Sequence, residues 1–171
     1  MTKHLILIYL FFTTSIATWS FGQSLRGQVF QIAADYSEDR CGVNPECDCC
    51  SSDLIFLTDK QFGMIGRCMY NDVYYTGQYS VNDGRLTLKF KPIIVIESID
   101  EETSKVENKK QTLKVDPLTY RISKCGQNAI RFQYARLEGK DLKNGSRVSR
   151  ARENEVINKL NRSEAWRLLT D

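Results

Sequence analysis

The chain has 171 residues, a length typical of one domain, and its 24 Lys and Arg against 21 Asp and Glu give a net charge of +3. A charge this balanced does not predict nucleic-acid binding. Six cysteines are a high count for this length, and the first of them is Cys41.

Residues 1–22 have the pattern of an export signal. Lys3 supplies the positive start, residues 5–12 form an apolar core, and Ser20-Phe21-Gly22 has small residues at the two positions that a signal peptidase requires. We therefore expect cleavage before Gln23 and an exported protein, periplasmic or secreted. The alternative is a membrane anchor. The apolar run is much shorter than the roughly 20 residues of a bilayer span, so we expect no membrane span.

The single histidine, His4, lies within this signal. The predicted mature protein therefore lacks the residue needed for a Ser-His-Asp triad, a Cys-His nucleophile pair, or His-ligated zinc or haem. The sequence also lacks the GxSxG, P-loop and dinucleotide-binding glycine patterns. We expect a non-catalytic protein without a cofactor. An enzyme that uses carboxylates or tyrosines is the alternative.

The clearest local signal is a hairpin over residues 75–90. Apolar residues alternate on both sides of Asn82-Asp83-Gly84, and an Asp-Gly pair supplies the positive φ angles that a tight hairpin requires. Short alternating or fully apolar stretches recur through residues 25–137, which predicts seven or eight strands. We therefore expect a mainly β fold, either an antiparallel β-barrel or a sandwich.

Two stretches that follow this hairpin in the sequence give separate predictions. Residues 99–110 are charged and lack apolar periodicity, which predicts an exposed loop or the end of a protruding hairpin. Residues 113–115 and 120–122 predict another pair of strands around Asp116-Pro117.

The composition changes after residue 137. Residues 138–149 are polar and basic and predict a linker, and residues 150–171 predict a helical tail, in which Asn161 and Glu164 fit a capping box. The expected organisation is a signal peptide at 1–22, a β-barrel at 23–137, then the linker and the tail. The tail is either a lid or partner-binding helix, or a helix packed on the barrel wall.

The cysteines predict disulfides, because six cysteines in an exported chain most simply form three bonds. Four lie in a polar segment of ten residues, and two lie in or beside predicted strands: Cys41, Cys47, Cys49, Cys50, Cys68 and Cys125. We expect the segment 41–50 to be bonded to the strand region through Cys68, Cys125 or both, since long closed loops constrain the unfolded chain most.

The alternative use of these side chains is a soft-metal site for copper, or a thiol-responsive centre. Thiolates and thioethers suit Cu(I), and the candidate ligands are Cys47, Cys49, Cys50, Cys68, Met64 and Met69. Their spacing matches no standard zinc pattern. Free-thiol titration distinguishes this alternative from structural disulfides.

Four tyrosines cluster in the middle of the predicted strands. Tyr70, Tyr74, Tyr75 and Tyr79 are candidate ligand contacts that form a stacking platform or one wall of a pocket. Ordinary strand propensity is the simpler account of them, because aromatic side chains fit a half-buried pleated surface.

A family resemblance is carried by residues 54–90. The segments Leu54-Ile55-Phe56-Leu57, Tyr75-Thr76-Gly77-Gln78-Tyr79-Ser80-Val81 and Gly84-Arg85-Leu86-Thr87-Leu88 resemble the lipocalin-like small β-barrel proteins of the bacterial cell envelope, which include the NlpE-related barrel. The resemblance implies a barrel that binds or buttresses rather than reacts. The resemblance supplies neither a ligand nor binding residues. Our own expectation for the partner is a small apolar ligand or another envelope protein.

Overall fold

The computed structural model describes residues 24–33, 36–37, 41–43, 51–68, 70–100, 102–125, 129–134 and 144–171. The predicted signal peptide and its cleavage site lie outside these residues. The candidate disulfide or metal residues Cys47, Cys49, Cys50 and Met69 lie outside them as well.

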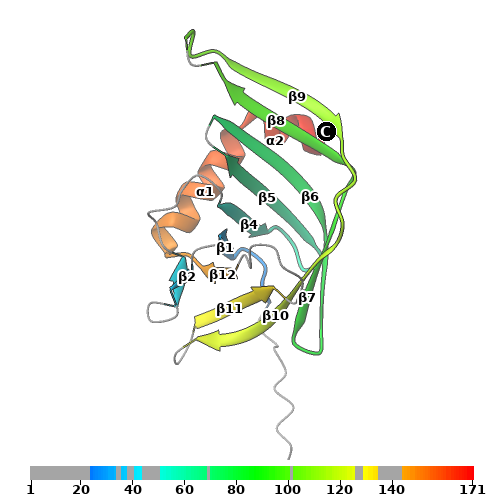
Figure 1. Ribbon diagram of the computed structural model, residues 1–171, viewed down its shortest axis with the longest axis vertical. Coiled ribbons are helices and arrows are strands. Elements are labelled where there is room, and N and C mark those ends of the chain that lie inside the picture. The colour runs from blue at the N-terminus through cyan, green and yellow to red at the C-terminus, as the bar shows by residue number, and fades with distance from the viewer. Residues whose placement is uncertain are drawn as a thin grey trace, which may run out of the picture.

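Eight antiparallel strands form a closed barrel (Figure 1). Their order around the barrel is β4 (Ser52–Phe56), β5 (Gln61–Cys68), β6 (Asn71–Asn82), β7 (Arg85–Phe90), β10 (Leu118–Cys125), β11 (Ala129–Tyr134), β12 (Asn144–Arg147) and β1 (Val29–Ala33), which pairs back with β4. A short separate hairpin, β2 (Tyr36–Ser37) and β3 (Gly42–Val43), follows β1. The predicted mainly β barrel of seven or eight strands is confirmed.

The predicted hairpin is β6–β7, and its turn has the expected chemistry. Asp83 and Gly84 have φ angles of 50° and 70°, and Asn82 pairs with Arg85 across the turn. Two consecutive positive φ angles match the right-handed twist of the flanking strands. The alternation of β6 and β7 then places every second side chain inside the barrel.

A second hairpin extends the sheet beyond the barrel. β7 and β8 (Ile93–Ile99) share one edge of β6, where β7 pairs with residues 77–82 and β8 pairs with residues 71–74. β9 (Val106–Thr112) pairs with β8 and forms the outer edge of the sheet. Most of β9 is exposed, and its charged residues protect that edge from pairing with another chain. Its lack of apolar alternation explains why the sequence predicts a loop or hairpin end at 99–110.

One expectation about strand pairing is wrong. The stretch 113–115 is not a strand and does not pair with 120–122. Instead, Tyr120 of β10 pairs with Leu86 of β7 and with Tyr134 of β11. The proline-containing connection between β9 and β10 crosses from the sheet extension to the barrel rather than making a local turn.

The predicted linker at 138–149 is also wrong in part, because Asn144–Arg147 forms β12 and closes the barrel between β1 and β11. This strand has no apolar pattern that the sequence could show. A Cβ atom on Gly145 would lie 3.2 Å from Cγ1 of Ile32 and 3.3 Å from Cβ of Phe132. The absent side chain therefore lets two core side chains meet at this strand.

The C-terminal part folds as two helices, α1 (Arg150–Arg162) and α2 (Glu164–Thr170). The hydroxyl of Ser149 accepts a hydrogen bond from the Arg152 backbone N–H, and the hydroxyl of Ser163 accepts one from the Trp166 backbone N–H. Each serine thus caps a helix N-terminus. The second helix begins after Ser163 rather than at the expected Asn161 box.

The apolar side chains form two layers separated by the barrel wall. The interior layer is built around Phe30, Phe56, Phe62 and Phe132. The outer layer lies between the wall and the helices, and its members are Val29, Ile55, Ile65, Tyr74, Val95, Val156, Leu160, Ala165 and Leu169. The helical tail is therefore packed on the barrel wall, as one of the two alternatives expects.

Candidate functional site

Aromatic side chains fill the middle of the barrel. The rings of Phe30 and Phe132 are stacked with centroids 4.3 Å apart, and Phe56 makes an edge contact with Phe30 at 5.7 Å. All three side chains are fully buried. A bound molecule in this part of the barrel would have to displace packed rings, so the barrel middle acts as a core.

An apolar surface continues from this core onto the sheet extension. The β6–β8 register pairs Val73 with Ile96, and alternation puts Tyr75, Ile94 and Ile96 on the side that faces the barrel interior. Tyr75 and Phe90 are partly buried and pack against the interior core, with their ring centroids 5.7 Å apart. We call the surface formed by Val73, Tyr75, Phe90, Ile94, Ile96 and Leu113 the mouth face.

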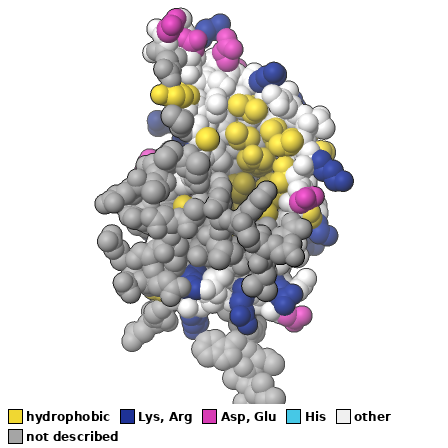
Figure 2. All heavy atoms as spheres, in the orientation of Figure 1, with side chains coloured by type: hydrophobic (Ala, Val, Ile, Leu, Met, Phe, Trp, Pro, Cys, Tyr) yellow, Lys and Arg dark blue, Asp and Glu magenta, His cyan; other side chains and the backbone are white. Residues whose placement is uncertain are grey.

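Leu113 lies at the far edge of the mouth face. Its backbone N–H donates to the carbonyl of Pro92 at 2.7 Å, which continues the β8–β9 ladder by one position. By strand alternation it shares the side of Ile94, and its side chain is 46% exposed. Figure 2 shows hydrophobic side chains gathered on this side of the molecule, over the region of β6, β8 and β9.

The four candidate tyrosines do not form one wall. Tyr75 and Tyr79 face the barrel interior, whereas Tyr74 lies in the outer layer under the helices. Tyr70 is 51% exposed in the turn before β6. Adjacent residues of a strand point to opposite faces, so Tyr74 and Tyr75 could not share a pocket. Of the four, only Tyr75 belongs to the mouth face.

Burial raises the pKa of the phenols of Tyr74, Tyr75 and Tyr79 above the usual value. The hydroxyl of Tyr74 donates to Oε1 of Glu97 at 3.3 Å, and that of Tyr79 donates to the carbonyl of Thr58 at 3.0 Å. These phenols are therefore neutral hydrogen-bond donors near neutral pH.

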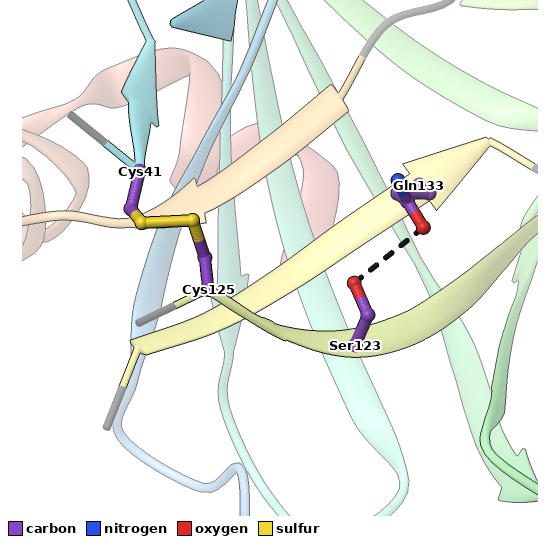
Figure 3. Close-up of a disulfide and its surroundings, with 4 residues drawn as sticks. All are labelled: Cys41, Ser123, Cys125 and Gln133. Atoms are coloured by element: carbon purple, nitrogen blue, oxygen red, sulfur yellow. Dashed lines mark hydrogen bonds between the residues drawn. A yellow bond between two sulfur atoms is a disulfide. The ribbon is translucent and has the colours of Figure 1, made fainter. Parts of the chain in front are cut away.

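The structure contains a disulfide between Cys41 and Cys125, with Cα atoms 5.6 Å apart (Figure 3). It ties the residue before β3 to the last residue of β10. Cys125 is one of the two strand cysteines to which the sequence predicts a link. The expectation of three disulfides includes a bond to Cys68, but the thiol of Cys68 is free and exposed in the structure.

The candidate metal ligands are not brought together among the described residues. Met64 is packed in the barrel interior and is 9% exposed, whereas Cys68 lies at the exposed end of β5. The described part of the chain contains no cluster of three or more His, Cys, Asp or Glu that could hold a metal ion. The other four candidates lie outside the described residues.

Charged residues that the sequence analysis did not single out join α1 to the barrel wall. The carboxylate of Asp53, with a side chain 2% exposed, pairs with the guanidinium of Arg67, and Nη2 of Arg152 lies 3.6 Å from its Oδ2. Lys159 of α1 pairs with Asp72 of β6. No local sequence signal identifies these partners, because they come from separate elements.

The arrangement defines a closed eight-stranded antiparallel barrel with a helical cover on one side and an apolar mouth face on the other. The structure is similar to the crystal structure of a streptavidin-like protein from Bacteroides eggerthii, with a TM-score of 0.52 and 12% sequence identity. The match covers 81% of this chain and 88% of that protein. At this identity the likeness shows the fold. No family model matches the chain, and no curated protein does.

Among the described residues, neither helix is long and apolar enough to cross a bilayer.

Proposed function

We propose that this protein is an exported, non-catalytic binding protein of the cell envelope that holds a small apolar ligand against the mouth face. The observation that supports this is the mouth face itself, an apolar and aromatic surface that runs from the barrel core out to the half-exposed Leu113. Exposed apolar surface that continues into a core is typical of a binding site rather than of solvated surface.

The fold supports the same conclusion. Barrels with about eight strands often take a small ligand at the open end, because the interior narrows around packed side chains while the mouth stays wide. The likeness to a streptavidin-like protein is compatible with a binding role. The Cys41–Cys125 bond is compatible with an oxidising compartment and hence with export. A relationship to the NlpE-related envelope barrels is part of this proposal.

The soft-metal or thiol-responsive alternative has less support among the described residues. The sulfur of Met64 is packed inside the barrel, and Cys68 is exposed. A copper site that used both of these sulfur atoms would need Met64 to leave the core. We therefore favour the apolar ligand.

The experiment uses the neutral fluorescent probe N-phenylnaphthylamine, whose emission rises in an apolar site. Leu113→Glu places a charge on the mouth face and should weaken probe binding about tenfold. The apolar contact is lost, and the bound probe would remove the new charge from water. Val106→Glu is the matched control. Val106 is 51% exposed on the same hairpin, and it pairs with Ile99 on the opposite side of the sheet.

The proposal is supported if Leu113→Glu weakens probe binding and Val106→Glu leaves it unchanged. Absence of any emission increase with the unsubstituted protein would refute it. Equal loss in both variants would also refute it, because binding would then not depend on the mouth face.

A further inference from the structure

A separate pocket of about 240 Å³ lies on the outer side of the barrel wall. It is formed by β5, β6, the segment after β7 and the C-terminal end of α2, and its lining residues are Leu57, Gln61, Phe62, Thr76, Gly77, Gln78, Lys91, Leu169 and Thr170. Thr76 and Gln78 alternate with Tyr75 along β6, so they point to the side opposite the mouth face. This pocket is therefore independent of the proposed ligand site.

One of the lining residues carries a buried polar atom without a partner. Thr76 is 7% exposed, and its Oγ1 makes no hydrogen bond in the structure. A buried hydroxyl without a partner is unfavourable, because it loses its hydrogen bonds to water and gains none. A molecule in the pocket that accepts a hydrogen bond would remove this cost.

The charge of the pocket selects among such molecules. Lys91 is the one charged side chain among the described lining residues, and no carboxylate is among them. Its backbone N–H donates to the carbonyl of Thr76 at 2.8 Å, which places residue 91 next to Thr76 in the structure. A second cation, Lys89, pairs with Gln78 in the β6–β7 register. With Lys91 as the charged group among these lining residues, the pocket favours an anion over a cation.

The remaining lining residues suit the two ends of a small organic anion. The carboxamides of Gln61 and Gln78 can donate hydrogen bonds to oxygen atoms, and Leu57 and Leu169 offer apolar contact. A volume of 240 Å³ corresponds to roughly eight water molecules at about 30 Å³ each. The pocket therefore has room for a carboxylate on a short apolar body.

We propose that this pocket binds a small organic monocarboxylate. The Thr76 hydroxyl donates to one carboxylate oxygen, the ammonium of Lys91 neutralises the charge, and the apolar body lies against Leu57 and Leu169. The binding is non-covalent and reversible.

The test titrates isotope-labelled protein with sodium benzoate and, separately, with the neutral analogue benzyl alcohol, and follows amide and side-chain carboxamide resonances by NMR. Benzoate should shift the resonances of Gln61, Thr76 and Leu169, and benzyl alcohol should not. Thr76→Val and Lys91→Met should each raise the benzoate Kd about tenfold, since each removes a contact to a charged group. Thr119→Val and Lys114→Met are the matched controls and should leave it unchanged.

Several results would overturn the proposal: no shifts with benzoate, equal binding of benzyl alcohol, shifts confined to the mouth face, or an unchanged Kd in both pocket variants. Thr76→Val keeps the side-chain volume, and Lys91 is exposed, so at least the lysine variant should fold. Failure of N-phenylnaphthylamine to bind would refute the mouth-face proposal and leave this one standing, because the two probes differ in charge and in site.

Discussion

The indole ring of Trp166 in α2 lies directly on Gly63 of β5. A Cβ atom on Gly63 would be 2.7 Å from Cη2 of the indole and 3.2 Å from Cζ3. Gly63 pairs with Thr76 in the β5–β6 ladder, so the contact fixes where α2 crosses the barrel wall. The absence of a side chain at one strand position is what allows the helix to lie this close.

We expect Gly63→Ala to destabilise the protein by about 1–3 kcal/mol, because the new methyl group forces the indole or the strand to move. The free energy of unfolding from urea denaturation measures this. Gly66→Ala on the same strand is the control. Its Cβ would meet Cε2 of Tyr75 at 3.5 Å, an ordinary contact. Equal stability of the two variants would show that the Trp166 contact does not position α2.

Sequence periodicity predicts the parts of this fold in which alternation is strong. The β6–β7 hairpin follows directly from alternating apolar residues around Asp83-Gly84, and the helical tail follows from the helical spacing of its apolar residues. The strand β12 could not be predicted from the sequence. The feature that matters at Gly145 is the space left by its absent side chain, which two core residues distant in sequence occupy. Propensity carries no information about such long-range packing.

The candidate site shows the same limit. The sequence groups four tyrosines, but adjacent strand positions separate Tyr74 from Tyr75 and leave one of the four on the mouth face. Nothing in the sequence marks Leu113 or Ile96 as a site residue, because their position beside the barrel depends on the pairing of β8 with residues 71–74 of β6. The pocket under α2 likewise needs the helix to be docked before Thr76 and Leu169 can meet.

Removal of the Cys41–Cys125 bond should destabilise the protein by up to about 4 kcal/mol, because the bond closes a loop across a sequence separation of 84 residues and so restricts the unfolded chain. The variant is Cys41→Ser with Cys125→Ser, compared with the unsubstituted protein by urea denaturation without reductant. Cys68→Ser is the control. Its thiol is free and exposed, so we expect a change within about 0.5 kcal/mol.

Non-reducing peptide mapping of the same samples identifies the bond directly. A peptide that joins Cys41 to Cys125 is the expected result. A linked peptide that contains Cys68 instead would contradict the structure. It would also make the Cys68→Ser variant the destabilised one.

The last prediction concerns the buried carboxyl group of Asp53. Burial raises the pKa of Asp53 above its ordinary value, and the nearby guanidinium groups of Arg67 and Arg152 offset only part of that effect. The folded state thus holds the proton more tightly than the unfolded chain does.

The stability that this difference contributes is fully present below the ordinary carboxyl pKa, and it is lost as the pH rises through the raised pKa of the folded state. Asp53→Asn cannot titrate. We therefore expect the free energy of unfolding of the unsubstituted protein, relative to Asp53→Asn, to fall as the pH rises above the ordinary carboxyl pKa of about 4.

Asp100 provides a control with the opposite sign. Its Oδ1 accepts hydrogen bonds of 2.7 Å from both the backbone N–H and the hydroxyl of Thr103, and these bonds lower its pKa. A lowered pKa contributes stability that is lost as the pH falls, so the difference between the unsubstituted protein and Asp100→Asn should rise with pH. Urea denaturation of the three proteins at constant ionic strength gives both slopes. If the Asp53 difference also rises with pH, the ion pairs with Arg67 and Arg152 outweigh burial, and Asp53 stabilises the attachment of α1 as a carboxylate.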